Sequence, residues 1–435
     1  MFKINNISNF IYWLINHEPI MVFSNFVESA YSKNTYLNLF LSSNQSQRIV
    51  NFGSNLLNSG FNEIDLTNSN RIKIIISGGG TGGHIFPAIA IANAIKKIEK
   101  NIDILFVGAL GKMEMEKVPA AGYPIEGLWI SGLKRRLSMD NLSFPFKITS
   151  SIAKARRIIK EFKPNVVIGV GGYASGPLLF AAAKKGIPTL IQEQNSFPGL
   201  TNKVLAKRVA KICVAYKGME KYFPKEKIIL TGNPVRQDIL QIANKRELAL
   251  EFFGLDKNKK TVLVIGGSLG SLTINRSIKN GLNKLNKNSI QLIWQTGKAF
   301  YNEANESISN FENSGIKVYD FINKMDYAYA ISDIVISRAG AIAISELCLV
   351  EKPVILVPSP NVAEDHQTKN ATTLVHNEAA ILIKDIEANY KLIDTAINLL
   401  LNDELKGKLQ KNISKLSIQN SADIIANEIL MLVKK

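Results

Sequence analysis

The sequence has little of what marks a secreted or membrane-spanning protein. Only two of its 435 residues are cysteines, Cys213 and Cys348. Each lies in an apolar stretch, which predicts buried thiols of a reducing compartment rather than a disulfide. No apolar run approaches the roughly 18–20 residues that a helix needs to span a bilayer. We therefore expect a cytoplasmic chain without a transmembrane segment.

Acidic residues are also scarce. The sequence has 36 Asp and Glu against 53 Lys and Arg, a net charge of +17. This balance favours anionic partners such as acidic lipids, phosphorylated substrates or nucleic acid. Because there is no Lys/Arg block interleaved with aromatic residues, no zinc-finger spacing and no RNA-binding signature, we expect no nucleic-acid partner.

Residues 1–70 lack the alternation of strand-like and helix-like segments that the rest of the chain shows. They are rich in Asn, Ser and Phe, and the apolar patch Phe10–Ile15 is too short for the core of a secretion signal. We expect a poorly ordered or artefactual N-terminal extension. A weak membrane-binding or partner-binding arm is the alternative.

From Arg71 onward, short apolar runs alternate with helix-like segments. Ile72–Ser77 is a β-branched run, followed by a Gly-rich turn and a predicted helix over 85–97. The same order restarts at Thr261–Ile265, with a second Gly-rich turn over 266–270 and a helix over 271–285. This pattern predicts two α/β units with parallel sheets, joined near residues 231–235. Ligands bind at the carboxyl ends of parallel strands, so two such sheets facing each other would enclose a cleft.

The first Gly-rich turn, Gly78–Gly83, formally contains the spacing G-x-G-x-x-G of dinucleotide-binding loops. Glycine lets the backbone approach a phosphate, and the following helix supplies free N–H groups. Two features disfavour a nicotinamide cofactor. No acidic residue ends the second strand, where Val107 is followed by Gly-Ala-Leu, and His84 follows the loop directly. We expect no cofactor.

Gly78-Gly-Gly-Thr-Gly-Gly-His-Ile-Phe-Pro87 resembles the MurG family of N-acetylglucosaminyltransferases. The resemblance does not rest on one loop, and it covers roughly residues 71–435. Further motifs follow in the family's order: Gly171-Gly-Tyr-Ala-Ser-Gly-Pro177, Glu193-Gln-Asn195, Gly199-Leu-Thr-Asn-Lys203, Gly232-Asn-Pro-Val-Arg236, Gly266-Gly-Ser268, Ser337-Arg-Ala-Gly340, Ser345-Glu346 and Gln367-Thr-Lys-Asn-Ala371.

The resemblance implies the α/β fold called GT-B, with two Rossmann-like parallel-sheet domains facing a cleft. Residues 71–235 would form the acceptor and membrane-side domain, residues 236–417 the UDP-GlcNAc-binding domain, and a helix at about 418–435 would pack back on the first. The implied reaction moves N-acetylglucosamine from UDP-GlcNAc, with inversion, to the 4-hydroxyl of undecaprenyl-pyrophosphoryl-MurNAc-pentapeptide. This step converts lipid I to lipid II in peptidoglycan synthesis.

The resemblance also implies the donor site and its chemistry. Ser268 and Arg236 would bind the pyrophosphate, Glu346 the ribose, Ile322 would lie against uracil, and Gln367 would bind the sugar. No metal is expected, and no Asp-x-Asp pair is present. The full donor set is Thr81, Gly82, Gly83, Asn195, Arg236, Ser268, Ile322, Ala341, Ile342, Ala343, Ile344, Ser345, Glu346 and Gln367.

His84 is the candidate general base, because an imidazole near neutral pKa suits removal of a hydroxyl proton. The alternative is that it caps the helix or orients the glycine loop. Glu193 could share or replace this role, or be a structural carboxylate in a buried network. Tyr173 and Ser175 fall on the acceptor side or in the loop scaffold. The family often has His at the position of Gln192, and Gln cannot act as an acid or base.

A basic and apolar segment lies between the predicted strands 102–107 and 166–170. It combines Trp129 with Lys134, Arg135 and Arg136, and Leu137, Met139, Leu142, Phe144 and Phe146 follow. Such a segment can sit on an anionic lipid surface. With the resemblance, it implies peripheral binding to the cytoplasmic side of the inner membrane, and cell-wall synthesis and division proteins as partners. An ordinary loop and amphipathic core helix is the alternative.

Two other functions stay open from the sequence. One is a different UDP-sugar transferase or epimerase of the same fold that uses no lipid acceptor. The other is an inactive protein that binds a lipid pyrophosphate.

Overall fold

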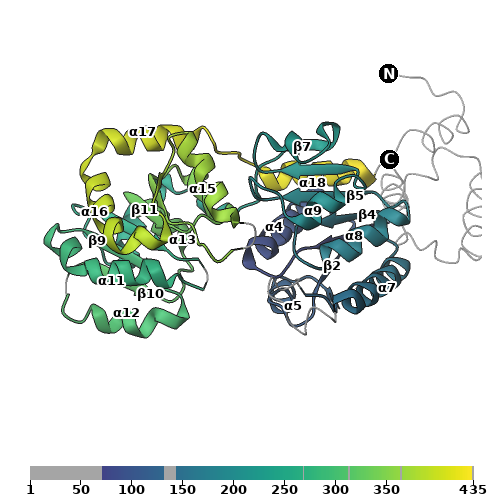
Figure 1. Ribbon diagram of the computed structural model, residues 1–435, viewed down its shortest axis with the longest axis horizontal. Helices are drawn as coiled ribbons and strands as arrows, with labels where there is room; N and C mark the ends of the chain where they lie inside the picture. The colour runs from purple at the N-terminus through teal and green to yellow at the C-terminus, as the bar shows by residue number, and fades with distance from the viewer. Residues whose placement is uncertain (1–70, 132–143, 268, 312–313, 363–364, 434–435) are drawn as a thin grey trace, which may run out of the picture. The chain divides into compact units, whose positions relative to one another are not determined.

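The computed structural model describes residues 71–131, 144–267, 269–311, 314–362 and 365–433. Residues 1–70 form a separate unit from residues 71–435, and only the second unit is described (Figure 1). None of the helices in these ranges is long and apolar enough to cross a membrane.

Two wholly parallel sheets make up the described part of the chain. The first has the strand order β3-β2-β1-β4-β5-β6-β7. Its strands are β1 (Ile72–Ser77), β2 (Ile102–Ala109), β3 (Ile125–Leu128), β4 (Val166–Gly169), β5 (Thr189–Glu193), β6 (Lys211–Val214) and β7 (Ile228–Leu230). Because β1 pairs with both β2 and β4, the chain reverses its direction of winding at β1.

The second sheet repeats this design, with the order β10-β9-β8-β11-β12-β13. Its strands are β8 (Thr261–Ile265), β9 (Gln291–Gln295), β10 (Ile316–Tyr319), β11 (Ile334–Ser337), β12 (Val354–Leu356) and β13 (Ile381–Leu382). Winding reverses between β8 and β11. In open parallel sheets, ligands bind outside the carboxyl ends of the strands at such reversal points.

Helices cover both faces of the first sheet (Figure 1). On one face, α4 (Gly82–Ile98) packs with the C-terminal helix α18 (Ser421–Val433), whose Ile425 and Ile429 are fully buried in the same cluster. On the other face lie α7 (Phe144–Phe162), α8 (Ser175–Lys184) and α9 (Leu200–Leu205). The last helix of the chain thus completes the core of the first sheet, while the predicted domain boundary at 235/236 stays a prediction.

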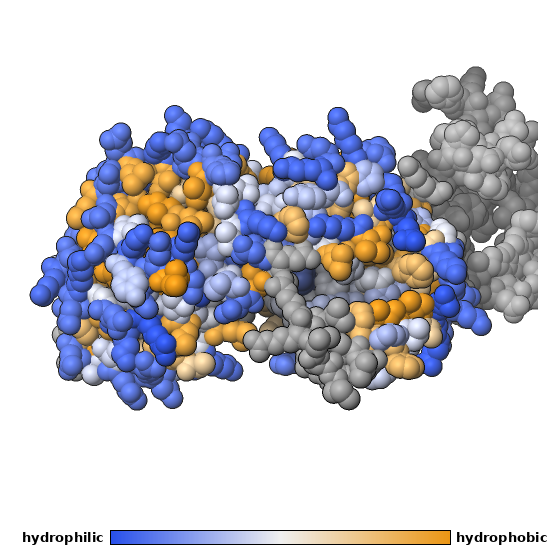
Figure 2. Space-filling view, viewed as in Figure 1, coloured by the Kyte–Doolittle hydropathy of each residue, from blue (hydrophilic) through white to orange (hydrophobic). Residues whose placement is uncertain are grey.

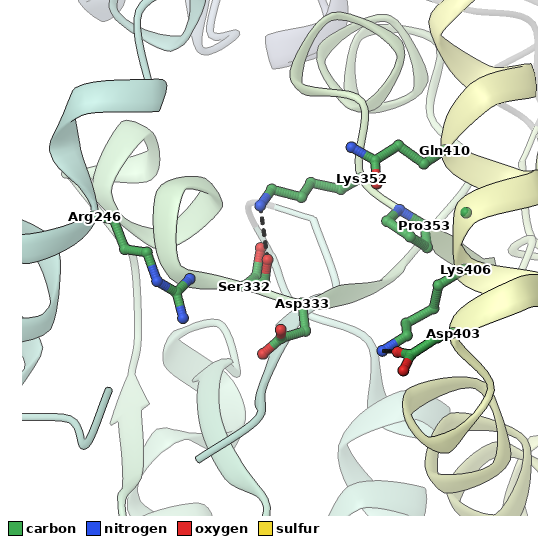
Figure 3. Close-up of a pocket in the computed structure, with 9 residues that line it drawn as sticks. Arg246, Ser332, Asp333, Lys352, Pro353, Asp403, Lys406 and Gln410 are labelled. Atoms are coloured by element: carbon green, nitrogen blue, oxygen red, sulfur yellow. Dashed lines mark hydrogen bonds and ion pairs between the residues drawn. The ribbon is translucent and has the colours of Figure 1, made fainter. Parts of the chain in front are cut away.

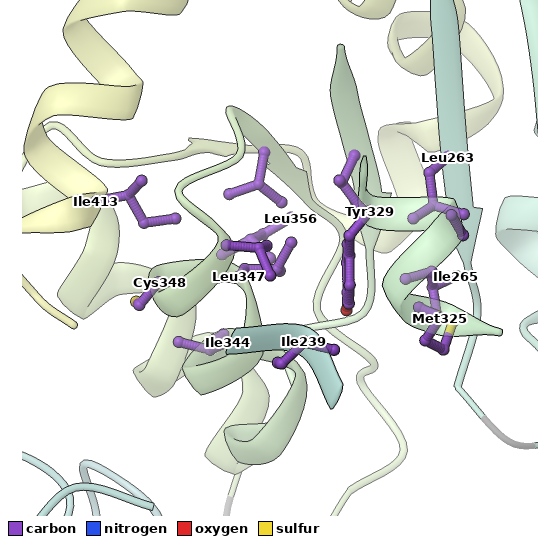
Figure 4. Packing of buried hydrophobic residues seen from close by; sticks show 14 of the residues in the cluster. Ile239, Leu263, Ile265, Met325, Tyr329, Ile344, Leu347, Cys348, Leu356 and Ile413 are labelled. Atoms are coloured by element: carbon purple, nitrogen blue, oxygen red, sulfur yellow. The ribbon is translucent and has the colours of Figure 1, made fainter. Parts of the chain in front are cut away.

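The second sheet is covered in the same way. One face carries α11 (Leu272–Lys287), α12 (Tyr301–Ser307) and α16 (Ala388–Leu401). The other carries α10 (Arg246–Phe253), α13 (Met325–Ile331), α14 (Ala341–Val350), α15 (His366–His376) and α17 (Asp403–Ser414). Figure 4 shows how Tyr329 packs between aliphatic side chains of this face. On the side of the molecule shown in Figure 2, hydrophilic residues are interspersed with hydrophobic patches.

The strands expected at Ile72–Ser77 and Thr261–Ile265 are confirmed, and both cysteines are buried and free as predicted. The first helix begins three residues earlier than expected, at Gly82. Thr81 adopts the extended conformation of an N-cap residue, so the helix starts on the glycines despite their low helix propensity. As a result, His84 lies in the first turn of α4 rather than in the loop.

Candidate functional site

The glycine turn after β1 packs directly against the loop after β4. A Cβ on Gly172 would come within 2.4 Å of the Gly79 carbonyl oxygen, and Gly172 has φ +90°. Glu114, which is fully buried on α5 (Glu114–Ala120), accepts hydrogen bonds from the Gly80 N–H at 2.8 Å and the Ala109 N–H at 3.0 Å. The turn is therefore fixed by backbone contact and by a buried carboxylate. Sequence reasoning missed Glu114, because nothing local separates it from Glu116.

His84 lies at this reversal point of the first sheet. Its Nδ1 is 3.0 Å from the Gly79 carbonyl oxygen and 3.4 Å from Thr81 Oγ1. A carbonyl only accepts, so Nδ1 carries the proton and Nε2 has a free lone pair. The ring lies against Gly171, where a Cβ would come within 2.7 Å of Nε2.

The protonation state of His84 follows from its surroundings. Burial lowers the pKa of His84 below its usual value of 6.5. The Gly79 carbonyl opposes this change, and nearby His366 lowers the pKa further. A neutral imidazole with an oriented lone pair can accept a proton from a hydroxyl group.

Ser175 and Tyr173 occupy very different positions in the loop after β4. Ser175 is fully buried, and its hydroxyl lies 2.9 Å from the Gly171 carbonyl oxygen and 3.1 Å from that of Ser77. It therefore ties the loop to the end of β1. Tyr173 is 50% exposed and is available to a ligand.

Glu193 ends β5 and is 3% exposed. Oε1 accepts hydrogen bonds from the backbone and side-chain N–H groups of Asn195 at 3.0 and 3.2 Å. Oε2 accepts from the Gly199 N–H at 3.1 Å and from Asn202 Nδ2 at 2.9 Å. Burial raises the pKa of the Glu193 carboxyl, and these four hydrogen bonds oppose the rise. The geometry favours the structural alternative, in which Glu193 positions the loop that carries Asn195.

In the second sheet, the first turn of α14 lies at the reversal point, directly after β11. Gly340 is its N-cap in extended conformation, with no side-chain cap. The residues of this turn, Ala341, Ile342 and Ala343, are partly exposed, while Ile344 is 1% exposed and packs in the core. N–H groups at a helix N-terminus attract anions. This turn can therefore hold a phosphate by its backbone alone.

Arg236 reaches the same helix from the segment between β7, the last strand of the first sheet, and β8, the first strand of the second. Its Nε donates to Glu346 Oε1 at 2.8 Å, while Tyr329 donates its hydroxyl to Oε2 at 3.1 Å. Burial raises the pKa of the Glu346 carboxyl, and Arg236 opposes the rise. The Arg236 side chain is 39% exposed, so its terminal nitrogens can reach a ligand.

Gln367 and Ile322 lie near the carboxyl ends of strands of the second sheet, Ile322 shortly after the edge strand β10. Gln367 Oε1 accepts from the Ala339 N–H at 3.2 Å and the Ser359 N–H at 2.8 Å, which leaves its Nε2 group to donate. Ile322 is 2% exposed, and its N–H donates to Gln295 Oε1 at 3.0 Å. The side chain of Ile322 thus offers little surface to a nucleobase.

Two asparagines, which were not singled out from the sequence, join residues of the two sheets. Asn370 is fully buried; its Nδ2 donates to Asn195 Oδ1 at 3.2 Å, and its Oδ1 accepts from the Ser196 N–H at 3.0 Å. Asn233 donates to Ser345 Oγ at 3.0 Å. Both asparagines lie inside motifs quoted above, but these contacts are with residues 112 or more positions away in the chain, which the motifs do not specify.

Gln192 is not in contact with the His84 site. It is 1% exposed on β5, and its Nε2 donates to Asn233 Oδ1 at 2.8 Å. In this structure Gln192 therefore holds Asn233, which in turn contacts Ser345.

The remaining predicted residues fall outside or at the edge of the described ranges. Ser268, Lys134, Arg135 and Arg136 lie outside the described residues. Trp129, directly after β3, is 51% exposed. Within the described ranges, no group of three His, Cys, Asp or Glu side chains is placed to hold a metal ion.

Comparison with known proteins places both halves of the described chain in one family. The glycosyltransferase family 28 N-terminal domain matches residues 74–214, and the C-terminal domain of that family matches residues 261–428. The UDP-N-acetylglucosamine–N-acetylmuramyl-(pentapeptide) pyrophosphoryl-undecaprenol N-acetylglucosamine transferase of Parabacteroides distasonis is 55% identical over 84% of this chain and 99% of its own length. The enzyme of the same name from Christiangramia forsetii is 52% identical over 83% of this chain and 98% of its own.

Solved structures agree with the sequence relatives. MurG of Acinetobacter baumannii superposes with a TM-score of 0.67 at 26% identity, over 83% of this chain and 99% of its own. A UDP-GlcNAc 2-epimerase from Neisseria meningitidis, 17% identical with a TM-score of 0.58 over 83% of this chain and 100% of its own, shares the fold alone. The architecture is the GT-B fold, as expected. The chain belongs to glycosyltransferase family 28 and, within it, to the MurG family.

Proposed function

We propose that this protein transfers N-acetylglucosamine from UDP-GlcNAc to the 4-hydroxyl of undecaprenyl-pyrophosphoryl-MurNAc-pentapeptide, producing lipid II from lipid I. The observation that carries the proposal is the neutral His84 imidazole, held by the Gly79 carbonyl with Nε2 free, at the reversal point of the first sheet. The names of the relatives supply the two substrates.

The proposed step is a single displacement at the anomeric carbon. The acceptor oxygen forms a bond to that carbon as its proton passes to His84 Nε2, and the bond from the carbon to the donor's phosphate oxygen breaks. General base assistance of this kind is typically worth about 10²–10⁴-fold in rate. The leaving UDP carries away the electron pair of the broken bond.

The second sheet would stabilise the charge that develops on UDP. The N–H groups of the first turn of α14 and the exposed nitrogens of Arg236 both favour an anion. Glu346 would meet the ribose while it fixes Arg236, and Gln367 Nε2 would meet the sugar. On the first sheet, Asn195 would be presented to the donor by the loop that Glu193 braces.

The test is a transfer assay with labelled UDP-GlcNAc and a short-chain lipid I analogue. We expect a disaccharide lipid product that carries the label, in amounts equal to the UDP released. Epimerised or hydrolysed donor without a labelled lipid would contradict the proposal and favour the UDP-sugar epimerase reading.

The second part of the proposal concerns the membrane. Phe146 on α7 is 71% exposed and Trp129 is 51% exposed, with Lys147 Nζ 5.8 Å from the Trp129 ring centre. Arg156 and Arg157 on the same helix are exposed. Apolar side chains among cations suit an anionic lipid surface. We expect this region to bind the cytoplasmic leaflet.

Vesicle co-sedimentation tests this part. Replacing both Phe146 and Trp129 by Ser should weaken binding to anionic vesicles, and added salt should weaken binding of the wild type because it screens the charges. The matched control replaces Ile386 and Tyr390, each 81% exposed near the second sheet, by Ser. Binding that salt leaves unchanged, or that the control lowers equally, would contradict the proposal.

A further inference from the structure

A polar cavity lies at the amino ends of β11 and β12, on the opposite side of the second sheet from the first turn of α14. Its volume is about 330 Å³. Ser332 and Asp333 precede β11, and Lys352 and Pro353 precede β12, so the cavity is at the amino ends of these strands. The first turn of α14 follows the carboxyl end of β11. The four residues of that strand separate the two places by roughly 13 Å at about 3.3 Å per residue.

Three cationic side chains line this cavity from three different elements. Arg246 begins α10, Lys352 follows α14, and Lys406 belongs to α17. Figure 3 shows Arg246 entering from one side and the two lysines from the other. Because the cations come from separate elements, the tertiary fold, rather than a local charge run, brings them together.

These cations have few partners. Within the described residues, Lys352 Nζ donates one hydrogen bond, to the Ser332 carbonyl oxygen at 2.8 Å. The only such contact of Arg246 is Nη1 to the Ile331 carbonyl oxygen at 3.4 Å. Lys406 donates to the Leu400 carbonyl oxygen at 2.9 Å and pairs with Asp403. An ammonium group has three donors and a guanidinium five, so several N–H groups remain for a ligand.

The two acids of the cavity offset only part of the charge of its three cations. Asp333 Oδ2 accepts from the Thr261 N–H at 2.7 Å, and Oδ1 lies 3.7 Å from Lys260, outside the cavity lining. The Asp403 side chain is 91% exposed and faces water. Burial lowers the pKa of Lys352 to about 8; Asp333 opposes this change and Arg246 adds to it. The lining thus carries one positive charge in excess, with the cations Arg246, Lys352 and Lys406 against the acids Asp333 and Asp403.

We propose that this cavity binds a small phosphate-type oxyanion, free or carried as a phosphate monoester, at a site separate from the donor site. Tetrahedral oxygens would accept from Lys352, Arg246 and Lys406 together, and charge-assisted hydrogen bonds of this kind are about twice as strong as neutral ones. There is room beside the anion for the rest of an ester. Gly407 lines the wall, and a Cβ added there would meet no atom within 4 Å.

The experiment measures binding of inorganic phosphate to the full chain by calorimetry, with UDP at saturation to fill the donor site and ionic strength held constant. Glucose 1-phosphate is the second probe and represents a monoester. We expect saturable binding of at least one probe. Tighter binding of the ester would mean that the anion is carried by a metabolite, and tighter binding of phosphate would mean that the free ion is the ligand.

The variants separate this cavity from general surface charge. Lys352→Met and Arg246→Gln should each raise the Kd at least 10-fold. Lys406→Met should do the same, while Lys408→Met on the same helix, whose side chain is 53% exposed and pairs with Glu378, should not. Arg246 is exposed, so the comparison of Arg246→Gln with Lys408→Met holds even if Lys352→Met fails to fold. Absence of binding by both probes, binding abolished by UDP, or equal Kd values in all variants would overturn the proposal.

Discussion

The openings of α4 and α14 are built alike and yet present different chemistry. Helix α4 follows β1 and α14 follows β11, each at the reversal point of its sheet. Each has an extended N-cap residue without a side-chain cap, Thr81 in α4 and Gly340 in α14. The third residue of α4 is His84, whereas the third residue of α14 is Ala343. One opening therefore offers a titratable nitrogen, and the other offers only peptide N–H groups. The same local fold can serve proton transfer or anion binding, depending on one side chain.

Of the substitutions at these two helix openings, removal of the His84 imidazole should have the largest effect on activity. His84→Gln should lower kcat for transfer to a lipid I analogue by about 10²–10⁴-fold, because a carboxamide cannot take the acceptor's proton. The KM for UDP-GlcNAc should change by much less. Steady-state kinetics measures both values, and His376→Gln, at the exposed end of α15, is the control. Nearly unchanged kcat would move the base to Glu193.

A charge placed at the third position of α14 should produce the next largest effect. Ala343→Asp should raise the KM for UDP-GlcNAc about 10-fold or more, because a carboxylate repels the donor's diphosphate. The same change should leave the melting temperature unchanged or slightly higher, since acids stabilise helix N-termini by about 0.3–1 kcal/mol. Ala343→Ser, which adds no charge, is the control. A KM that stays the same in the Asp variant would mean that this turn does not bind the donor.

The smallest expected effect is in the pH profile. Because burial lowers the pKa of His84 below 6.5, more than half of the free enzyme carries the neutral imidazole at pH 6.5. The value of kcat/KM at pH 6.5 should therefore be more than half of its plateau, and the acid limb should lie below that pH. A limb centred above pH 6.5 would show that His84 is not the base, or that its protonated form is stabilised.

The sequence allowed the local architecture to be predicted well. β-branched runs before glycine turns placed β1 and β8, and the alternation of runs and helices predicted two parallel sheets. Short strands were missed, among them β3, β6 and β7, because β3 contains a Glu and a Gly, β6 begins with a Lys, and β7 has only three residues. The sequence placed the start of α4 three residues late. In the structure, the extended N-cap conformation of Thr81 starts the helix at Gly82 despite the low helix propensity of glycine.

The site was predictable only in part. The motif that contains His84 pointed to a base, and the structure adds which ring nitrogen is free, because the Gly79 carbonyl fixes the other one. Glu114, Asn233 and Asn370 were not singled out, since their partners come from distant segments or their neighbours look the same. Glu193 could be read either as a base or as a brace, and only its four hydrogen bonds favour the brace.

The principal elements, the glycine turns and the family could be predicted from residue types at short spacing. Which buried polar groups meet and which cations converge depends instead on contacts between segments that are distant in the chain. Arg246, Lys352 and Lys406 lie far apart in the chain and became one cavity through the packing of α10, α14 and α17 around the sheet. Burial and hydrogen-bond partners are long-range properties, and they set the proton position on His84 and the role of Glu193.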